Sequence, residues 1–431
     1  MESSDVIEPQ IKKEPARLRG FRDAVWLNRS RLGAYPKLFL IAYAVSVAGW
    51  LLMGHGLTDR KGKPIGADFV EFWSASNLTL GRTPASAYKQ SSLWAAERAA
   101  VASKTLAFTP FPYPPPCLLM IAPLASLPYL WSLAVWSAVG LLLYLWVLRR
   151  ITHDATDSVW LTLAFPGAVI NLMNGQNGFI TLALLGSGVL YLEQSPILAG
   201  VLFGISSYKP QFVTLVPLFL IVTRRWRTLA VFGLSVVLLY GASLVAFGGR
   251  TWTAFLSSLT YTQTVVLEQG GTGWAKTQSI FGAARMSGLG IEGSYLLHGL
   301  VAVAAVAVAS WIWRHTDNIA LQGSALITAA LLFTPHLMPY DLVQLSLPIA
   351  WLAVDGLRSD FLPWDKNLLA LSWVYPLLTV QVAQYGVALG WAVPLMLLLL
   401  ALRRVRYEGA ILSPARPAPT PARPFNPVLE R

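Results

Sequence analysis

Two acidic residues, Asp68 and Glu71, lie three positions apart in the segment GADFVEFW, in a chain with 21 acidic and 33 basic residues. The segment from Asp68 to Leu80 can form a short helix that Gly81 would end. At the start of a helix, Asp68 can act as an N-cap with Glu71 completing a capping box. A carboxylate that faces a cavity can instead remove a proton from a hydroxyl as a general base. Both interpretations of Asp68 fit the sequence.

Lys209, in SYKPQF, lies between two apolar segments at residues 196–208 and 211–223. Each segment is too short to cross a bilayer, so we expect a broken pair of helices that meets at Lys209. An ionisable group at membrane depth is costly and therefore points to function. A lysine ammonium suits a phosphate group. The alternative is a lysine that snorkels to the membrane interface.

Two further polar segments interrupt the apolar sequence. FTPHLMPYD places His336 and Asp341 around two prolines, and MNGQNGF places Gln176 between two apolar stretches. An imidazole can donate to a phosphate or orient a carboxylate, and the amide of Gln176 can hydrogen-bond a sugar. Prolines that end a helix, and polar residues in a tight turn, would also be expected without any function.

Several other classes of site have no support in the sequence. It contains no phosphate-binding glycine loop, no HExxH motif, no nucleophile elbow and no DxD-type diacid, so ATP-driven and metalloprotease chemistry are not indicated. Cys117 is the single cysteine, which excludes an internal disulfide and a cysteine-based metal cluster. These absences give no support to a cysteine-based or HExxH metal site, and we expect no cofactor.

The composition predicts an all-α polytopic membrane protein. Hydrophobic residues make up 55% of the 431 positions and charged residues only 13%, and the mean hydropathy is +0.53. Soluble domains carry about 25% charged residues. The net charge of +12 collects in the tails and short loops, as membrane orientation requires, so we do not expect nucleic acid as a partner.

Apolar stretches predict about 11 to 13 transmembrane or half-membrane helices. They lie at about residues 36–55, 117–131 (broken), 132–148, 158–173, 178–193, 196–208, 211–223, 227–247, 295–313, 319–334, 340–355, 367–383 and 386–402.

Arginines and lysines in the short loops fix the expected orientation. The predicted divisions are a cytoplasmic N-terminal tail (1–34), a transmembrane domain (35–402) and a Pro/Arg-rich, disordered cytoplasmic tail (403–431). On the outer side we expect residues 56–131, 173–179, 250–294 and 333–341, with short helices in the first of these loops. The residues that could perform chemistry thus face outward.

These motifs together resemble glycosyltransferase family 87, also known by the label DUF2029. The resemblance rests on DFVEFW followed by GRTPASAY, and then on FPYPPP with PLASLPY, NGQN, AGVLFGISSYKPQ with RRWR, and TPHLMPYD. It covers roughly residues 40–400, and the motifs occur in the family's order.

The resemblance implies a GT-C type membrane hexosyltransferase. Such an enzyme transfers a sugar, often mannose, from a polyprenyl phosphate to a lipid or glycan acceptor on the outer face of the cytoplasmic (inner) membrane. The family's catalytic aspartate in the first outer loop corresponds to Asp68, which would act as the base with inversion at the anomeric carbon. We assign Lys209 and His336 to the donor phosphate. Gln176, Asp341 and Glu71 are candidates for binding the sugar or the acceptor, or for orienting the catalytic groups.

One departure from related enzymes concerns the metal. Many GT-C enzymes carry a diacid that binds a metal ion, whereas Asp68 is followed by Phe69 and Val70. Glu71 comes one helical turn later, where capping or local support is the expected role, so we predict a metal-independent reaction. The competing class is a transporter or lipid flippase, which also uses broken helices and a lysine at mid-membrane depth. The matched repeats typical of a duplicated transporter are not visible.

Overall fold

The computed structural model describes residues 16–54, 56–153 and 156–412. Helices dominate these residues, and they contain no β-strand, only an isolated bridge between Thr58 and Pro64. The prediction of an all-α polytopic membrane protein is therefore confirmed.

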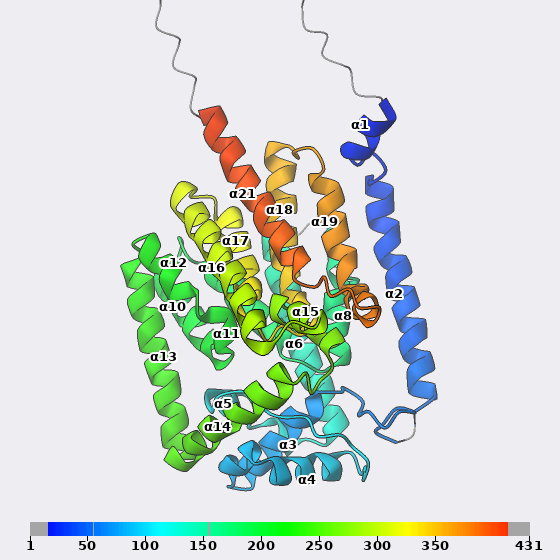
Figure 1. Cartoon of the computed structure of the whole chain (residues 1–431), viewed down its shortest axis with the longest axis vertical. Coiled ribbons are helices and arrows are strands. Elements are labelled where there is room, and N and C mark those ends of the chain that lie inside the picture. Colours follow the sequence, from blue (N-terminus) through cyan, green and yellow to red (C-terminus); the bar gives the residue numbers. More distant parts are fainter. Residues whose placement is uncertain (1–15, 55, 154–155, 413–431) are drawn as a thin grey trace, which may run out of the picture.

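Four helices are long and apolar enough to cross a membrane: α2 (Arg29–Leu52), α6 (Tyr129–Ile151), α13 (Trp226–Phe247) and α16 (Ile291–His315). The helices α2 and α13 stand at opposite sides of the bundle (Figure 1). In each of these two helices only 6% of the residues in the apolar 18-residue stretch are buried. Their apolar side chains therefore face outward, where lipid would surround them.

Shorter helices fill the space between them. The expected break at Lys209 is present, since α10 (Pro196–Ile205) and a 3₁₀ turn precede it and α11 (Pro210–Val213) follows. The predicted span at 158–173 is also interrupted, by Pro166, which begins a separate helix. A proline lacks the N–H that a helix interior needs, but it fits the first turn of a new helix.

The remaining elements have the following bounds: α7 (Thr156–Leu163), α8 (Pro166–Met173), α9 (Gly178–Leu190), α12 (Val216–Val222), α15 (Ile280–Met286), α17 (Ile319–Phe333), η6 (Pro339–Leu345), α18 (Ser346–Ser359), α19 (Asp365–Val374), η7 (Tyr375–Leu377) and α20 (Thr379–Gln384). The main apolar core lies among α9, α17 and α18, and α17 is buried on every side from Leu321 to Leu332.

A cap of short helices closes one end of the bundle (Figure 1). It consists of α3 (Phe69–Leu80), η1 (Pro84–Tyr88), α4 (Gln90–Ala100), α5 (Pro116–Ile121), η2 (Leu124–Ser126) and α14 (Gly249–Tyr261). The short helix predicted after Asp68 is α3, and Gly81 follows its last residue. Aromatic rings hold the cap together; the centroids of Phe72 and Tyr113 are 5.3 Å apart. The first loop thus forms a packed platform with its own apolar core.

Both ends of the described chain, α1 (Ala16–Arg22) and α21 (Ala392–Leu412), lie at the opposite end from the cap (Figure 1). The helix α21 continues past Arg403, where we expected the disordered tail to begin. The rest of that tail, residues 413–431, and the first 15 residues of the N-terminal tail lie outside the described residues.

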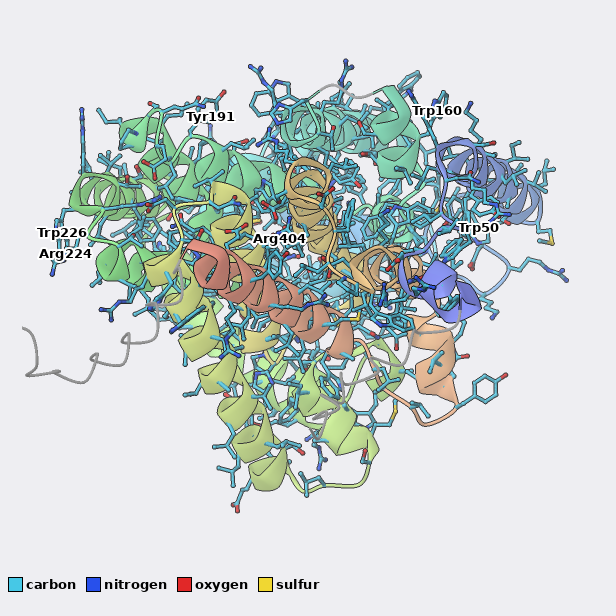
Figure 2. All side chains as sticks on the ribbon, turned by 90° about the horizontal axis from the view of Figure 1, so that it is seen from above. Trp50, Trp160, Tyr191, Arg224, Trp226 and Arg404 are labelled. Atoms are coloured by element: carbon cyan, nitrogen blue, oxygen red, sulfur yellow. The ribbon has the colours of Figure 1, made fainter. Side chains whose placement is uncertain are left out.

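Arginines at this end belong partly to buried ion pairs. Seen from this side (Figure 2), Arg224 and Trp226 lie at the rim, whereas Arg404 lies between α21 and α18. Arg404 Nε is 2.8 Å from Asp355 Oδ2, and both side chains are buried. The pair fixes α21 to α18.

Candidate functional site

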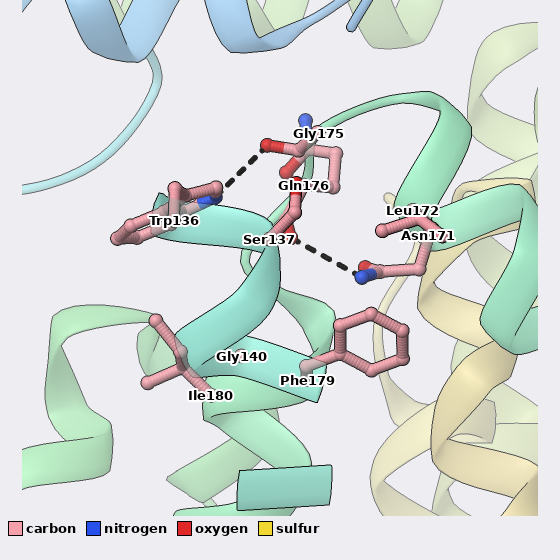
Figure 3. Close-up of a pocket in the computed structure, with 9 residues that line it drawn as sticks. All are labelled: Trp136, Ser137, Gly140, Asn171, Leu172, Gly175, Gln176, Phe179 and Ile180. Carbon is pink, nitrogen blue, oxygen red and sulfur yellow. Dashed lines mark hydrogen bonds between the residues drawn. The ribbon is translucent and has the colours of Figure 1, made fainter. Parts of the chain in front are cut away.

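The turn between α8 and α9 carries Gln176 and is fixed on both sides. Trp136 Nε1 donates to Gly175 O at 3.0 Å, and Asn171 Nδ2 donates to Gln176 O at 3.2 Å (Figure 3). Asn171 Oδ1 also accepts from Gly178 N at 3.0 Å. The pocket that these residues line leaves no room for a water molecule, so it is a packed junction and does not admit a substrate.

The same turn is pressed against the beginning of α3. Gly175 has a φ of +57°, and a Cβ atom there would come within 2.6 Å of Phe69 Cβ. Glycine is required both by the backbone conformation and by the close approach. This contact brings Gln176 to the two acidic residues of α3, which are more than a hundred positions away in sequence.

The side chain of Gln176 connects both acids. Its Nε2 donates to Asp68 Oδ2 at 3.0 Å and to Glu71 Oε1 at 3.4 Å. Its Oε1 accepts from the Tyr113 hydroxyl at 3.1 Å and from Asn177 N at 3.3 Å. Both ends of the amide are thus engaged within the protein, and the chief effect of Gln176 in this arrangement is to position Asp68.

The capping interpretation of Asp68 and Glu71 is wrong. Asp68 occupies the N-cap position of α3, but its side chain makes no capping hydrogen bond. The two carboxyl groups differ in access: Asp68 is partly exposed, while Glu71 is 3% exposed. Only Asp68 can therefore meet a substrate without a rearrangement.

Lys209 points into the protein, which contradicts the snorkelling alternative. Its Nζ is 2.7 Å from Asp341 Oδ1 and 2.9 Å from Asn177 Oδ1, and the residue is 2% exposed. Asp341 Oδ2 in turn accepts from Met338 N at 3.1 Å. Polar contacts thus run from Asp68 through the turn at 176–177 to Lys209 and Asp341. The predicted residues from four distant segments meet in one place.

His336 lies in the loop between α17 and η6, close to this ion pair. Burial lowers the pKa of its imidazole, while the charge of Asp341 raises it and that of Lys209 lowers it further. The net direction is downward, which favours the neutral ring at neutral pH. A neutral imidazole can still donate one hydrogen bond.

Glu97, on α4, is a third acid beside the site, and it is not among the predicted site residues. It is fully buried; Glu97 Oε2 accepts from Thr109 N at 3.2 Å, and Oε1 has no hydrogen-bond partner among the described residues. A signal was present, because Glu97 comes four residues after Leu93, on the apolar face of its helix.

Burial dominates the protonation of these acids. It raises the pKa values of Asp68 and Glu71 and raises that of Glu97 to about 8. The Gln176 hydrogen bond and then the charges of Lys276 and Lys63 oppose the shift at Asp68. At Glu71 the neighbouring charges of Asp68 and Glu97 raise the pKa further. Of Asp68 and Glu71, Asp68 is therefore the more readily ionised.

We predict that Glu97 makes stability depend on pH. Its pKa is about 8 in the folded protein, against 4.5 for an ordinary glutamate. The folded state therefore binds the proton more tightly, and stability that is fully present below about pH 4.5 is lost as the pH rises through about 8. The Tm of the purified protein should fall by a few degrees between pH 5 and 8. Glu97→Gln should reduce this fall in Tm, whereas Glu292→Gln, at an exposed position, should not. An equal fall in Tm in the wild type and both variants would contradict the prediction.

Among residues 16–54, 56–153 and 156–412, no group of three or more His, Cys, Asp or Glu side chains is arranged to hold a metal ion. The carboxyl groups beside Asp68 are engaged by Gln176 and Thr109 instead. Metal independence stays a prediction.

Comparison with known proteins gives one match. The model of glycosyltransferase family 87 matches residues 111–335, just over half of the chain. The matched range contains Gln176 and Lys209 and ends one residue before His336, whereas Asp68 precedes it. No curated protein and no solved structure matches.

Proposed function

Because the chain belongs to glycosyltransferase family 87, we propose that this membrane glycosyltransferase uses a polyprenyl-phosphate sugar, with mannose as the first sugar to test, and transfers it to a hydroxyl of a lipid or glycan acceptor. The transporter or flippase alternative has no comparable support. The observation that carries the proposal is the position of Asp68, a partly exposed carboxyl held by Gln176 above a buried polar cluster.

Asp68 would serve as the general base. It would accept the proton of the acceptor hydroxyl while the oxygen attacks the anomeric carbon, and the bond from that carbon to the phosphate oxygen would break. A single displacement inverts the anomeric configuration. The leaving phosphate is already stable as an anion, so no second carboxyl group is needed to protonate it, in contrast to the two carboxyl groups of glycosidases.

Lys209 and His336 would contact the leaving phosphate. An ammonium has three protons to donate. Two of the Lys209 protons are used by Asn177 and Asp341, which leaves one for a phosphate oxygen. Because the side chain is only 2% exposed, this contact requires a local rearrangement when the donor binds. The rings of Tyr113, Phe212 and Tyr340 lie 5.2 to 5.9 Å from the ammonium and exclude water around it. Asp341 would hold Lys209 in place.

The proposed orientation places the cap and Asp68 on the outer face of the cytoplasmic membrane. Its support is the distribution of arginines: Arg149 and Arg150 lie in the last turn of α6, and Arg314 lies in the last turn of α16. The acids Asp68, Glu71 and Glu97 belong to the cap. Positive loops remain in the cytoplasm.

A transfer assay tests the function directly. Membranes that contain the protein are incubated with radiolabelled mannosyl polyprenyl phosphate and an extract of lipids and glycans from the same membranes, and labelled products are separated from the donor. We expect a labelled product that is absent without the protein. Transfer from a nucleotide sugar in membranes free of polyprenyl phosphate would contradict the proposed donor.

A further inference from the structure

Once a donor phosphate enters, the site holds more negative charge than its buried cations can balance. Four carboxyl groups lie in it or beside it, those of Asp68, Glu71, Glu97 and Asp341. The charge of Lys209 is matched by Asp341 at 2.7 Å, and burial favours the neutral form of His336. Burial raises the pKa values of Glu71 and Glu97 and so favours their neutral forms, which leaves Asp68 as the carboxylate without a buried cation. A donor phosphodiester adds a second negative charge. Its binding therefore requires positive charge from outside the buried cluster.

Lys276 lies on a segment that is tied to the His336 loop. This segment follows the π-helix η4 (Thr262–Glu268) and runs between α14, in the cap, and α15, above it (Figure 1). It contains a short 3₁₀ helix, Trp274–Lys276, of which Lys276 is the last residue. Gln278 N donates to the carbonyl oxygen of the residue after His336 at 2.7 Å. Ser279 Oγ donates to the carbonyl oxygen of the residue before His336 at 2.6 Å. These bonds fix the backbone beside Lys276 to the edge of the site.

Two exposed lysines from separate loops act on the same carboxyl group. Lys276 and Lys63 are both exposed, and the charge of each lowers the pKa of Asp68. Lys63 lies five residues before Asp68, in a turn that Asp59 Oδ1 stabilises by accepting from the Lys63 backbone N–H at 2.9 Å. Neither ammonium forms an ion pair within the described part of the chain. The segment of Lys276 is hydrogen-bonded to the His336 loop, and Lys63 lies in the turn that leads to Asp68, so both lysines are available to an anion at the mouth of the site.

We propose that Lys276, with Lys63 as a second cation, binds the phosphate group of a lipid phosphate at the mouth of the site, above the Lys209–Asp341 pair. This inference rests on the proposed function, because it assigns the donor of that reaction to a specific cation. The exposed lysines capture the phosphate from the membrane surface, where a lipid headgroup would present it. The lipid tail then lies outside the cap, along the apolar helices.

Binding of a lipid phosphate without a sugar tests the site independently of catalysis. The purified full-length protein in detergent is titrated with undecaprenyl phosphate and, separately, with undecaprenol, which lacks the phosphate. Binding is followed by the fluorescence of the tryptophans, including Trp274 beside Lys276. The wild type should prefer the phosphate. Lys276→Gln should weaken phosphate binding by about tenfold, the scale of one lost hydrogen bond to a charged group, and leave undecaprenol binding unchanged.

Matched variants complete the test. Lys276→Arg keeps the charge and should retain most of the preference, whereas Lys104→Gln, which removes another exposed lysine of the first outer loop, should bind like the wild type. Equal affinity of the wild type for phosphate and alcohol, or an unchanged preference in Lys276→Gln, would overturn the proposal. If sugar transfer proceeds normally in Lys276→Gln, this inference fails and the proposed function stands. If the wild type transfers no sugar from any lipid phosphate, the proposed function itself fails.

Discussion

Replacing Asp68 by asparagine should lower sugar transfer by about 10²- to 10⁴-fold, the range expected when a general base is removed. Asparagine has nearly the same shape, and its side-chain oxygen can still accept the hydrogen bond that Gln176 Nε2 gives to Asp68 Oδ2. The fold of the cap should therefore persist while the proton acceptor is lost. The measurement is the initial rate of transfer from the radiolabelled lipid donor at saturating acceptor.

Two controls separate catalysis from structure. Glu292→Gln removes an exposed acid in the first turn of α16 and should retain the wild-type rate. The Tm of Asp68→Asn should remain close to that of the wild type. Transfer by Asp68→Asn at more than a tenth of the wild-type rate would remove Asp68 from the role of base.

The pH dependence of the reaction also tests the assignment of Asp68 as the general base. Burial raises the pKa of Asp68, so its protonated, inactive form persists to a higher pH than for an ordinary aspartate. The value of kcat/KM should fall as the pH drops through this raised pKa. Lys276→Gln removes a charge that lowers the pKa of Asp68, so the acid limb of this variant should shift further toward neutral pH.

The sequence predicted the elements of this fold better than their contacts. Apolar length indicated the long helices α2, α6, α13 and α16, because a bilayer requires about 20 apolar residues. It did not predict the division at Pro166 within the 158–173 span, since a proline can kink a helix or begin a new one. The capping interpretation failed for a related reason: local sequence showed a cap at Asp68, whereas the competing partner, Gln176, is 108 positions away.

For the site, the sequence likewise predicted which residues belong to it better than how they pair. Costly polar residues in apolar surroundings marked Lys209, His336 and Asp341, and the structure brings them together. The pairing of Lys209 with Asp341 was not predictable, because an ion pair across 132 positions depends on how the broken helices pack. Glu97 was missed because one acid on a short amphipathic helix resembles a solvated residue unless the helix face is counted.

The Lys209–Asp341 pair should be the most sensitive point for stability. Both side chains are 2% exposed, so removing one partner leaves a buried charge without its counter-ion. Breaking such a pair costs about 3–5 kcal/mol in the free energy of unfolding. Lys209→Met leaves Asp341 with the Met338 N–H as its remaining partner, and Asp341→Leu leaves the ammonium with Asn177 alone. Each single variant should show a markedly lower Tm in detergent.

The double variant Lys209→Met/Asp341→Leu decides whether the loss is electrostatic. It places two apolar side chains in an environment already lined by Phe212, so it should recover much of the stability that either single variant loses. The coupling energy of this double-mutant cycle measures the pair directly. Sugar transfer should remain low in the double variant despite its recovered Tm, because the proposed phosphate donor Lys209 is absent. Losses that simply add in the double variant would show that the two residues act separately, and recovery of transfer together with Tm would reduce Lys209 to a structural role.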